Sequence, residues 1–165
     1  MNEETRDDVT TTMNHYQGKE GRKMENENSK IKSESLKNRV LVVDDQYGIR
    51  ILIKEILKKD GIEALLASNG AQALDVLSRK KPKLVLLDMR IPGMSGVDIL
   101  KKIKEISPAT VVMIMTAYGD DAMISEAKKN GAVAYFPKPF DINELLHAVH
   151  HALFGSISKK SDRSL

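Results

Sequence analysis

The sequence contains no cysteine and no tryptophan, and only 4% of its 165 residues are aromatic. The lack of cysteine excludes a disulfide framework, a thiol nucleophile and a thiolate metal site. The N-terminus lacks an apolar signal segment, and no uninterrupted apolar run approaches the roughly 18 residues that a membrane span needs. These absences predict a soluble, cytoplasmic protein.

The chain also lacks a strong excess of charge of one sign. Its 26 Lys and Arg residues stand against 23 Asp and Glu residues, which gives a formal net charge of +3. The surplus cations lie near the ends of helical patterns, such as Lys58 and Lys59, where they offset the helix dipole. We therefore expect neither nucleic acid nor a membrane surface among the partners.

Residues 1–38 are rich in Glu, Asn, Lys, Ser and Thr, with isolated apolar residues that follow no period. Such a segment cannot bury enough apolar surface to offset the entropy lost on ordering. The composition predicts a disordered N-terminal arm over 1–38, one globular domain over 39–154 and a flexible tail over 155–165. There is little room for a second domain.

The globular part alternates short apolar runs with amphipathic segments, five times over. The apolar runs are Val40–Val43, Glu63–Ala67, Leu84–Leu87, Val111–Met115 and Val133–Phe136. Runs of this length are typical of buried parallel strands, and each is followed by a helical pattern. The first helical pattern has an apolar face that consists of Ile49, Leu52, Ile53, Ile56 and Leu57. The alternation predicts an α/β protein, a flavodoxin-like doubly wound (βα)5 sandwich whose parallel sheet has the order 2-1-3-4-5.

Reactive side chains follow four of the five runs. Asp44 and Asp45 follow the first run, Asp88 the third, Thr116 the fourth and Lys138 the fifth. In the order 2-1-3-4-5 these four strands are neighbours, so we expect the side chains to converge at the carboxyl edge of the sheet. Taken singly, Asp45 could cap the following helix and Lys138 could be a solvated loop lysine. The joint pattern favours a shared site.

Three carboxylates that are forced together repel one another unless a cation joins them. Oxygen ligands without His or Cys favour Mg²⁺, which binds carboxylates together with phosphate oxygens. Lys138 and Thr116 would then contact phosphoryl oxygens. Asp88 remains as the nucleophile that would form an aspartyl phosphate.

With these positions in place, Val40–Leu153 closely resembles the receiver domain of two-component response regulators. The resemblance rests on Asp44-Asp45, on Asp88 within Leu-Leu-Asp-Met-Arg-Ile-Pro-Gly-Met, on Thr116-Ala117 and on Lys138-Pro139, in order and spacing. The segments that begin at Val43, Met115 and Lys138 resemble the single-domain regulators of sporulation phosphorelays in particular. Pro137, which removes a backbone donor just before Lys138, departs from the family pattern.

The resemblance implies a different role for each residue of the site. Asp45 and Asp88 would bind Mg²⁺ directly, with the backbone carbonyl of Arg90 as a further ligand, and Asp44 would act mainly through water. Lys138 would precede a cis peptide bond.

Phosphorylation, by the same resemblance, would draw Thr116 inward and bury Tyr135, which acts as a switch. The protein would be a phosphoacceptor that catalyses its own phosphotransfer and slow autodephosphorylation, rather than a conventional turnover enzyme.

The resemblance also implies a docking surface for helical partners that carry a histidine. It would consist of Gln46, Tyr47, Ile49, Leu52, Pro139 and Phe140. The alternative for Ile49 and Leu52 is that they belong to the core face of their helix.

The predicted function is that of a monomeric carrier in a phosphorelay, in control of sporulation initiation. A sensor histidine kinase would phosphorylate Asp88, and a histidine phosphotransferase would take the phosphoryl group. One alternative is a chemotaxis-type regulator that binds the flagellar motor. A more distant one is an aspartate-dependent phosphatase, although Asp88 is not followed two positions on by the second Asp that such enzymes use.

Overall fold

The computed structural model of the protein describes residues 38–117 and 121–155. Its first strand begins at Arg39 and its last helix ends at Phe154. The predicted arm, apart from Asn38, and the predicted tail, apart from Gly155, lie outside the described residues. In the described ranges, no helix is long and apolar enough to cross a lipid bilayer.

Strands and helices alternate along the described chain as the sequence predicts. They are β1 (Arg39–Val43), α2 (Tyr47–Lys59), β2 (Glu63–Ala67), α3 (Gly70–Lys80), β3 (Leu84–Asp88), α4 (Gly96–Ile106), β4 (Val111–Thr116), α5 (Asp121–Lys129), β5 (Ala132–Pro137) and α6 (Ile142–Phe154). The strands form one sheet of order β2-β1-β3-β4-β5, and every neighbouring pair is parallel. The flavodoxin-like fold is confirmed.

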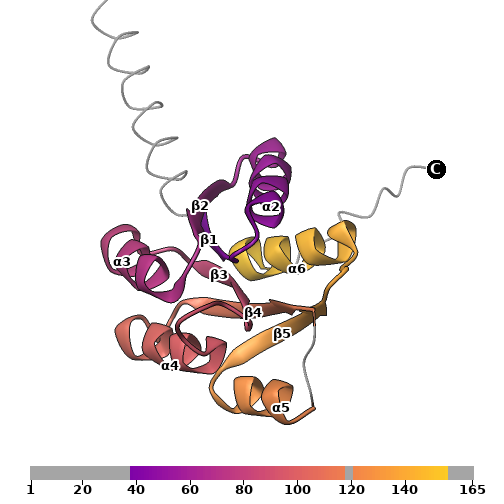
Figure 1. Ribbon diagram of the computed structural model, residues 1–165. Helices are drawn as coiled ribbons and strands as arrows, with labels where there is room; N and C mark the ends of the chain where they lie inside the picture. Colours follow the sequence, from indigo (N-terminus) through magenta and orange to yellow (C-terminus); the bar gives the residue numbers. More distant parts are fainter. Residues whose placement is uncertain (1–37, 118–120, 156–165) are drawn as a thin grey trace, which may run out of the picture. The chain divides into compact units, whose positions relative to one another are not determined.

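Helices cover both faces of the sheet, α2 and α6 on one side and α3, α4 and α5 on the other (Figure 1). Side chains of a strand alternate between the faces, so each strand supplies two cores. Leu41 and Val43 of β1 pack into the core under α3, α4 and α5. Val40 and Val42 pack into the core under α2 and α6. This double burial explains why the strands read as continuous apolar runs rather than as alternating ones.

The apolar face of α2 differs from the expectation at one position. Ile53 and Leu57 are buried against the sheet and Ile49 is half-buried beside them. Leu52, however, is 46% exposed. The core-face alternative is therefore wrong for Leu52, which lies beyond the edge of the stripe that contacts the sheet, and partly right for Ile49.

Pro137 ends β5, an edge strand, without costing a sheet hydrogen bond. The backbone N–H of Lys138 donates to the carbonyl oxygen of Thr116 on β4, at 2.9 Å. Because successive residues of a strand direct their N–H groups to opposite sides, the position of Pro137 faces the open edge of the sheet. Its missing donor is at the one side of β5 that has no neighbouring strand.

Gly96 allows the loop after β3 to fold closely against the start of α4. A Cβ atom at Gly96 would lie 2.5 Å from the Cα atom of Met89 and 2.9 Å from its carbonyl oxygen. The Gly96 N–H donates to that same oxygen, at 3.3 Å. Since Met89 directly follows Asp88, this close contact holds the end of β3 in place.

We predict that Gly96→Ala lowers the free energy of unfolding by about 1–3 kcal/mol, because backbone must move to admit the methyl group. Urea denaturation would measure the change. Gly48→Ala in α2 is the matched control, since no atom lies within 4 Å of its added Cβ. The control should gain up to about 1 kcal/mol from the better helix propensity of alanine. Equal stabilities of Gly96→Ala and the wild type would contradict the prediction.

Candidate functional site

Two carboxylates and an amine from three different strand ends meet at the carboxyl edge of the sheet. The Nζ atom of Lys138 lies 2.5 Å from Oδ2 of Asp44 and 2.8 Å from Oδ2 of Asp88. Asp44 directly follows β1, Asp88 ends β3 and Lys138 directly follows β5. The strand order requires Lys138 to reach past the end of β4, and its bond with the following Pro139 is cis.

Backbone donors orient the other oxygen of each carboxylate. Oδ1 of Asp44 accepts from the N–H of Gln46 at 2.9 Å, and Oδ1 of Asp88 accepts from the N–H of Arg90 at 3.0 Å. Each Asp therefore binds the peptide two residues ahead, as short polar side chains commonly do at turns. Both carboxylates have one oxygen toward Lys138 and one toward the backbone.

Burial makes these charges strongly dependent on one another. The side chain of Asp44 is 0% exposed, that of Asp88 5% and that of Lys138 9%. Burial raises the pKa of Asp44 above its usual value, although the hydrogen bond from Lys138 opposes it. Burial alone would lower the pKa of Lys138, but hydrogen bonds to Asp44 and Asp88 outweigh it and the pKa is raised. Lys138 is consequently held in its charged form.

Asp45 completes an acidic cluster with one open side. Its carboxylate is exposed, and the ligand atoms of Asp44, Asp45 and Asp88 all lie within 4.8 Å of one another. Three carboxylates and one ammonium leave a formal charge of −2, which a divalent cation would balance. Carboxylate oxygens without His or Cys are the ligands that suit Mg²⁺. The residues therefore fit the predicted metal.

Arg90, the other predicted ligand, lies beside this cluster. Its backbone N–H donates to Asp88, so the peptide that follows Met89 is at the site. The metal-binding role of its carbonyl group stays a prediction.

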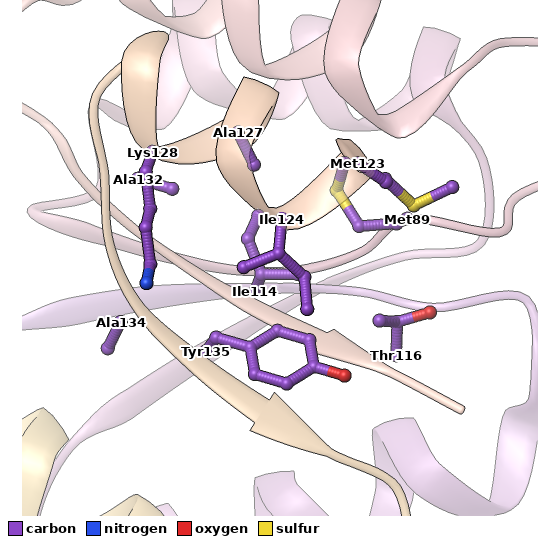
Figure 2. A pocket seen from close by; sticks show the side chains of 10 residues that line it. All are labelled: Met89, Ile114, Thr116, Met123, Ile124, Ala127, Lys128, Ala132, Ala134 and Tyr135. Atoms are coloured by element: carbon purple, nitrogen blue, oxygen red, sulfur yellow. The ribbon is translucent and has the colours of Figure 1, made fainter. Parts of the chain in front are cut away.

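Thr116 and Tyr135 line a small cavity beneath α5. Thr116 is fully buried at the end of β4, and Tyr135 is half-buried on β5. Figure 2 shows the tyrosine ring alongside Ile114, with its hydroxyl directed toward the side on which Thr116 lies. The cavity itself holds about 10 Å³, room for roughly one water molecule. Thr116, predicted as a catalytic residue, and Tyr135, predicted as the switch, therefore line one cavity.

The predicted docking residues differ in exposure. Tyr47 is 70% exposed and Leu52 46% exposed on α2. Gln46 and Pro139 are exposed as well, whereas Ile49 and Phe140 are half-buried against the core under α2 and α6. Gln46 and Pro139 directly border the cluster through Asp45 and Lys138.

One residue at the site escaped the sequence analysis. Arg50 of α2 donates from Nη1 to the carbonyl oxygens of Asp44, at 2.6 Å, and Asp45, at 3.0 Å. A signal was present: Arg50 is a cation in the first turn of a helix, where the dipole disfavours positive charge.

The chain is similar to known proteins across its described part. The family model of the response regulator receiver domain matches residues 40–150. The sporulation initiation phosphotransferase F of Bacillus subtilis (strain 168) is 53% identical over 114 residues, covering 69% of this chain and 92% of that protein. The chemotaxis protein CheY of the same strain is 37% identical over 117 residues, covering 70% of this chain and 98% of that protein. Among solved structures, a response regulator receiver domain protein (CheY-like) from Methanospirillum hungatei JF-1 matches with a TM-score of 0.69 and 28% identity, covering 70% of this chain and 93% of that one.

The charge balance of the cluster predicts opposite effects of Asp45→Asn with and without Mg²⁺. Without the ion, removing one of three crowded charges should raise the free energy of unfolding by roughly 0.5–1 kcal/mol. With Mg²⁺, the wild type should gain stability by mass action and the variant should gain much less. Urea denaturation in EDTA and in excess Mg²⁺ measures both. Glu105→Gln, which neutralises an exposed carboxylate on α4, is the control and should leave the Mg²⁺ response unchanged. An equal Mg²⁺ response of Asp45→Asn and the wild type would count against the site.

Proposed function

Because the chain belongs to the response regulator receiver domain family, we propose that it acts as the intermediate carrier of a phosphorelay. Asp88 accepts a phosphoryl group from the phosphohistidine of a sensor kinase and passes it to a histidine of a phosphotransferase. The observation that carries the proposal is the pairing of Asp88 with Lys138 beside the open carboxylate of Asp45. Phosphoryl transfer needs a nucleophile, a fixed cation and a place where a divalent metal ion can bind. The uncompensated negative charge of the cluster would provide that place.

In the transfer step, a carboxylate oxygen of Asp88 attacks the phosphorus atom of the phosphohistidine. An O–P bond forms, the P–N bond breaks, and its electron pair returns to the imidazole nitrogen. The buried ion pair keeps Asp88 in reach of a cation throughout. The reverse reaction on a second histidine returns the phosphoryl group to nitrogen.

The neighbouring side chains stabilise the charge that moves. Lys138 exchanges part of its contact with Asp88 for a phosphoryl oxygen, and the hydroxyl of Thr116 donates to another. Asp45, Asp88 and the Arg90 carbonyl would hold Mg²⁺, with Asp44 acting through water, and the ion would supply positive charge to offset that of the carboxylates and the phosphoryl oxygens. These groups also support slow self-hydrolysis of the aspartyl phosphate.

Tyr135 is the proposed readout of phosphorylation. It lines the same cavity as Thr116, so movement of the threonine toward a phosphoryl group changes the space available to the ring. Burial of Tyr135 would then shift an existing equilibrium between two conformations.

The docking surface and the similarity to a sporulation phosphotransferase together support a role in sporulation initiation. Tyr47 and Leu52 offer apolar contact to a partner helix next to Asp45, with Gln46, Ile49, Pro139 and Phe140 around them. We expect the carrier to act as a monomer in the cytoplasm, where ATP is the phosphoryl donor for the kinase.

A chemotaxis-type regulator is the second candidate, favoured by the similarity to a chemotaxis protein along nearly that protein's whole length. The two candidates share the site and differ in output. A relay carrier loses its phosphoryl group to a histidine, whereas a chemotaxis-type regulator binds a motor component while phosphorylated.

We predict that the full chain becomes labelled when mixed with a sensor kinase phosphorylated from radiolabelled ATP, and that Asp88→Ala does not. The label should require Mg²⁺ and should move on to a histidine phosphotransferase within the assay. Asp98→Ala, which removes an exposed carboxylate from α4, is the matched control and should be labelled as the wild type is.

Labelling of Asp88→Ala, or an unlabelled wild type in Mg²⁺, would refute the proposal. Stable binding of the phosphorylated protein to a motor switch component, without transfer to any histidine, would favour the chemotaxis-type candidate. Sustained hydrolysis of a generic phosphate ester would instead favour a phosphatase.

A further inference from the structure

The loop Asp44–Gln46 carries two of the three clustered carboxylates, and its two aspartates are held very differently. The side chain of Asp44 is fixed by Lys138 and by the N–H of Gln46, and its own N–H donates to Ala67 at 3.2 Å. Asp45 is exposed. Within residues 38–117 and 121–155, the hydrogen bond from Arg50 to its carbonyl oxygen is the one that fixes Asp45.

We infer that Arg50 is the positioning residue of this loop. A single nitrogen, Nη1, has two hydrogens, and the structure directs them at two successive carbonyl groups, 2.6 Å and 3.0 Å away. Two bonds from one rigid guanidinium set the angle between the two peptides and so the direction in which each carboxylate leaves the backbone. The inference rests on the proposed function, because it concerns how the metal ligands are placed.

A further contact joins the guanidinium of Arg50 to the ring of Tyr47. Its Cζ atom lies 5.7 Å from the centre of the Tyr47 ring, within the range of a cation–π contact. Arg50 is half-buried, whereas Tyr47 is 70% exposed. Arg50 therefore lies between the proposed docking surface and the loop that carries the acidic ligands.

Electrostatics and positioning predict opposite consequences for the metal. A cation beside the cluster repels Mg²⁺, so loss of its charge alone would tighten Mg²⁺ binding. Loss of the two hydrogen bonds would loosen the loop and weaken binding, as the removal of groups that orient metal ligands commonly does by 10–100-fold. The sign of the change separates the two roles.

The test compares the full-length wild type with Arg50→Met, which keeps an unbranched apolar stem and removes both charge and donors. Isothermal titration with Mg²⁺ alone should show a Kd about 10-fold weaker for Arg50→Met. Arg50→Lys, which keeps the charge without the rigid pair of donors, should fall between the two. Lys54→Met removes a charge one turn further along α2, from an exposed position, and should bind as tightly as the wild type or slightly more tightly.

A metal-free measurement separates this inference from the proposed function. Without Mg²⁺, hydrogen exchange of the Gln46 amide, which donates to Asp44, should be several-fold faster in Arg50→Met than in the wild type or Lys54→Met. Unchanged exchange together with unchanged or tighter Mg²⁺ binding in Arg50→Met would overturn the inference. A wild type that neither binds Mg²⁺ nor accepts phosphate, with the exchange effect present, would overturn the proposed function and leave the positioning role of Arg50 established.

Discussion

The contact on which the site depends is the double ion pair of Lys138 with Asp44 and Asp88, which joins the ends of β1, β3 and β5. β4 lies between β5 and β3, so the lysine must cross a neighbouring strand end to reach either carboxylate. The parallel sheet of this order brings the ends of β1, β3 and β5 to one edge, so that Lys138 contacts Asp44 across 94 positions of sequence. The buried contacts of Lys138 with Asp44 and Asp88 therefore depend on the strand order.

The cluster of Asp44, Asp45, Asp88 and Lys138 has more negative than positive charge, and part of that charge is buried. Burial opposes the charge of Asp44, and three carboxylates share one ammonium. A buried pair that is well packed and hydrogen-bonded is tolerated, but it adds little net stability. The uncompensated negative charge next to exposed Asp45 makes the cluster one that could hold a dication. A neutral core at this edge would avoid the cost of burying these charges but could not hold a cation.

Much of the architecture could be predicted because its causes are local. Five apolar runs, each long enough for one buried strand, specify the sheet, and the reactive side chains after four of them specify the edge. Apolar periodicity alone could not predict the exposure of Leu52, since it does not reveal where the contact stripe of α2 ends; only the resemblance to receiver domains placed Leu52 on an outer surface. The role of Arg50 was hidden for another reason. Its partners are backbone carbonyl groups, which have no sequence identity, and only the tertiary course of the loop shows them.

The shortness of the β1–α2 connection ties recognition to chemistry. Three residues, Asp44 to Gln46, separate the buried strand from a helix whose first residue is the exposed Tyr47. Arg50, one turn into that helix, is bonded back to the same three-residue loop. Because the connection is short and bonded to Arg50, we expect a movement of the start of α2 to move the carbonyl groups of Asp44 and Asp45 as well. The proposed docking surface and the proposed metal ligands are thus joined by one short turn.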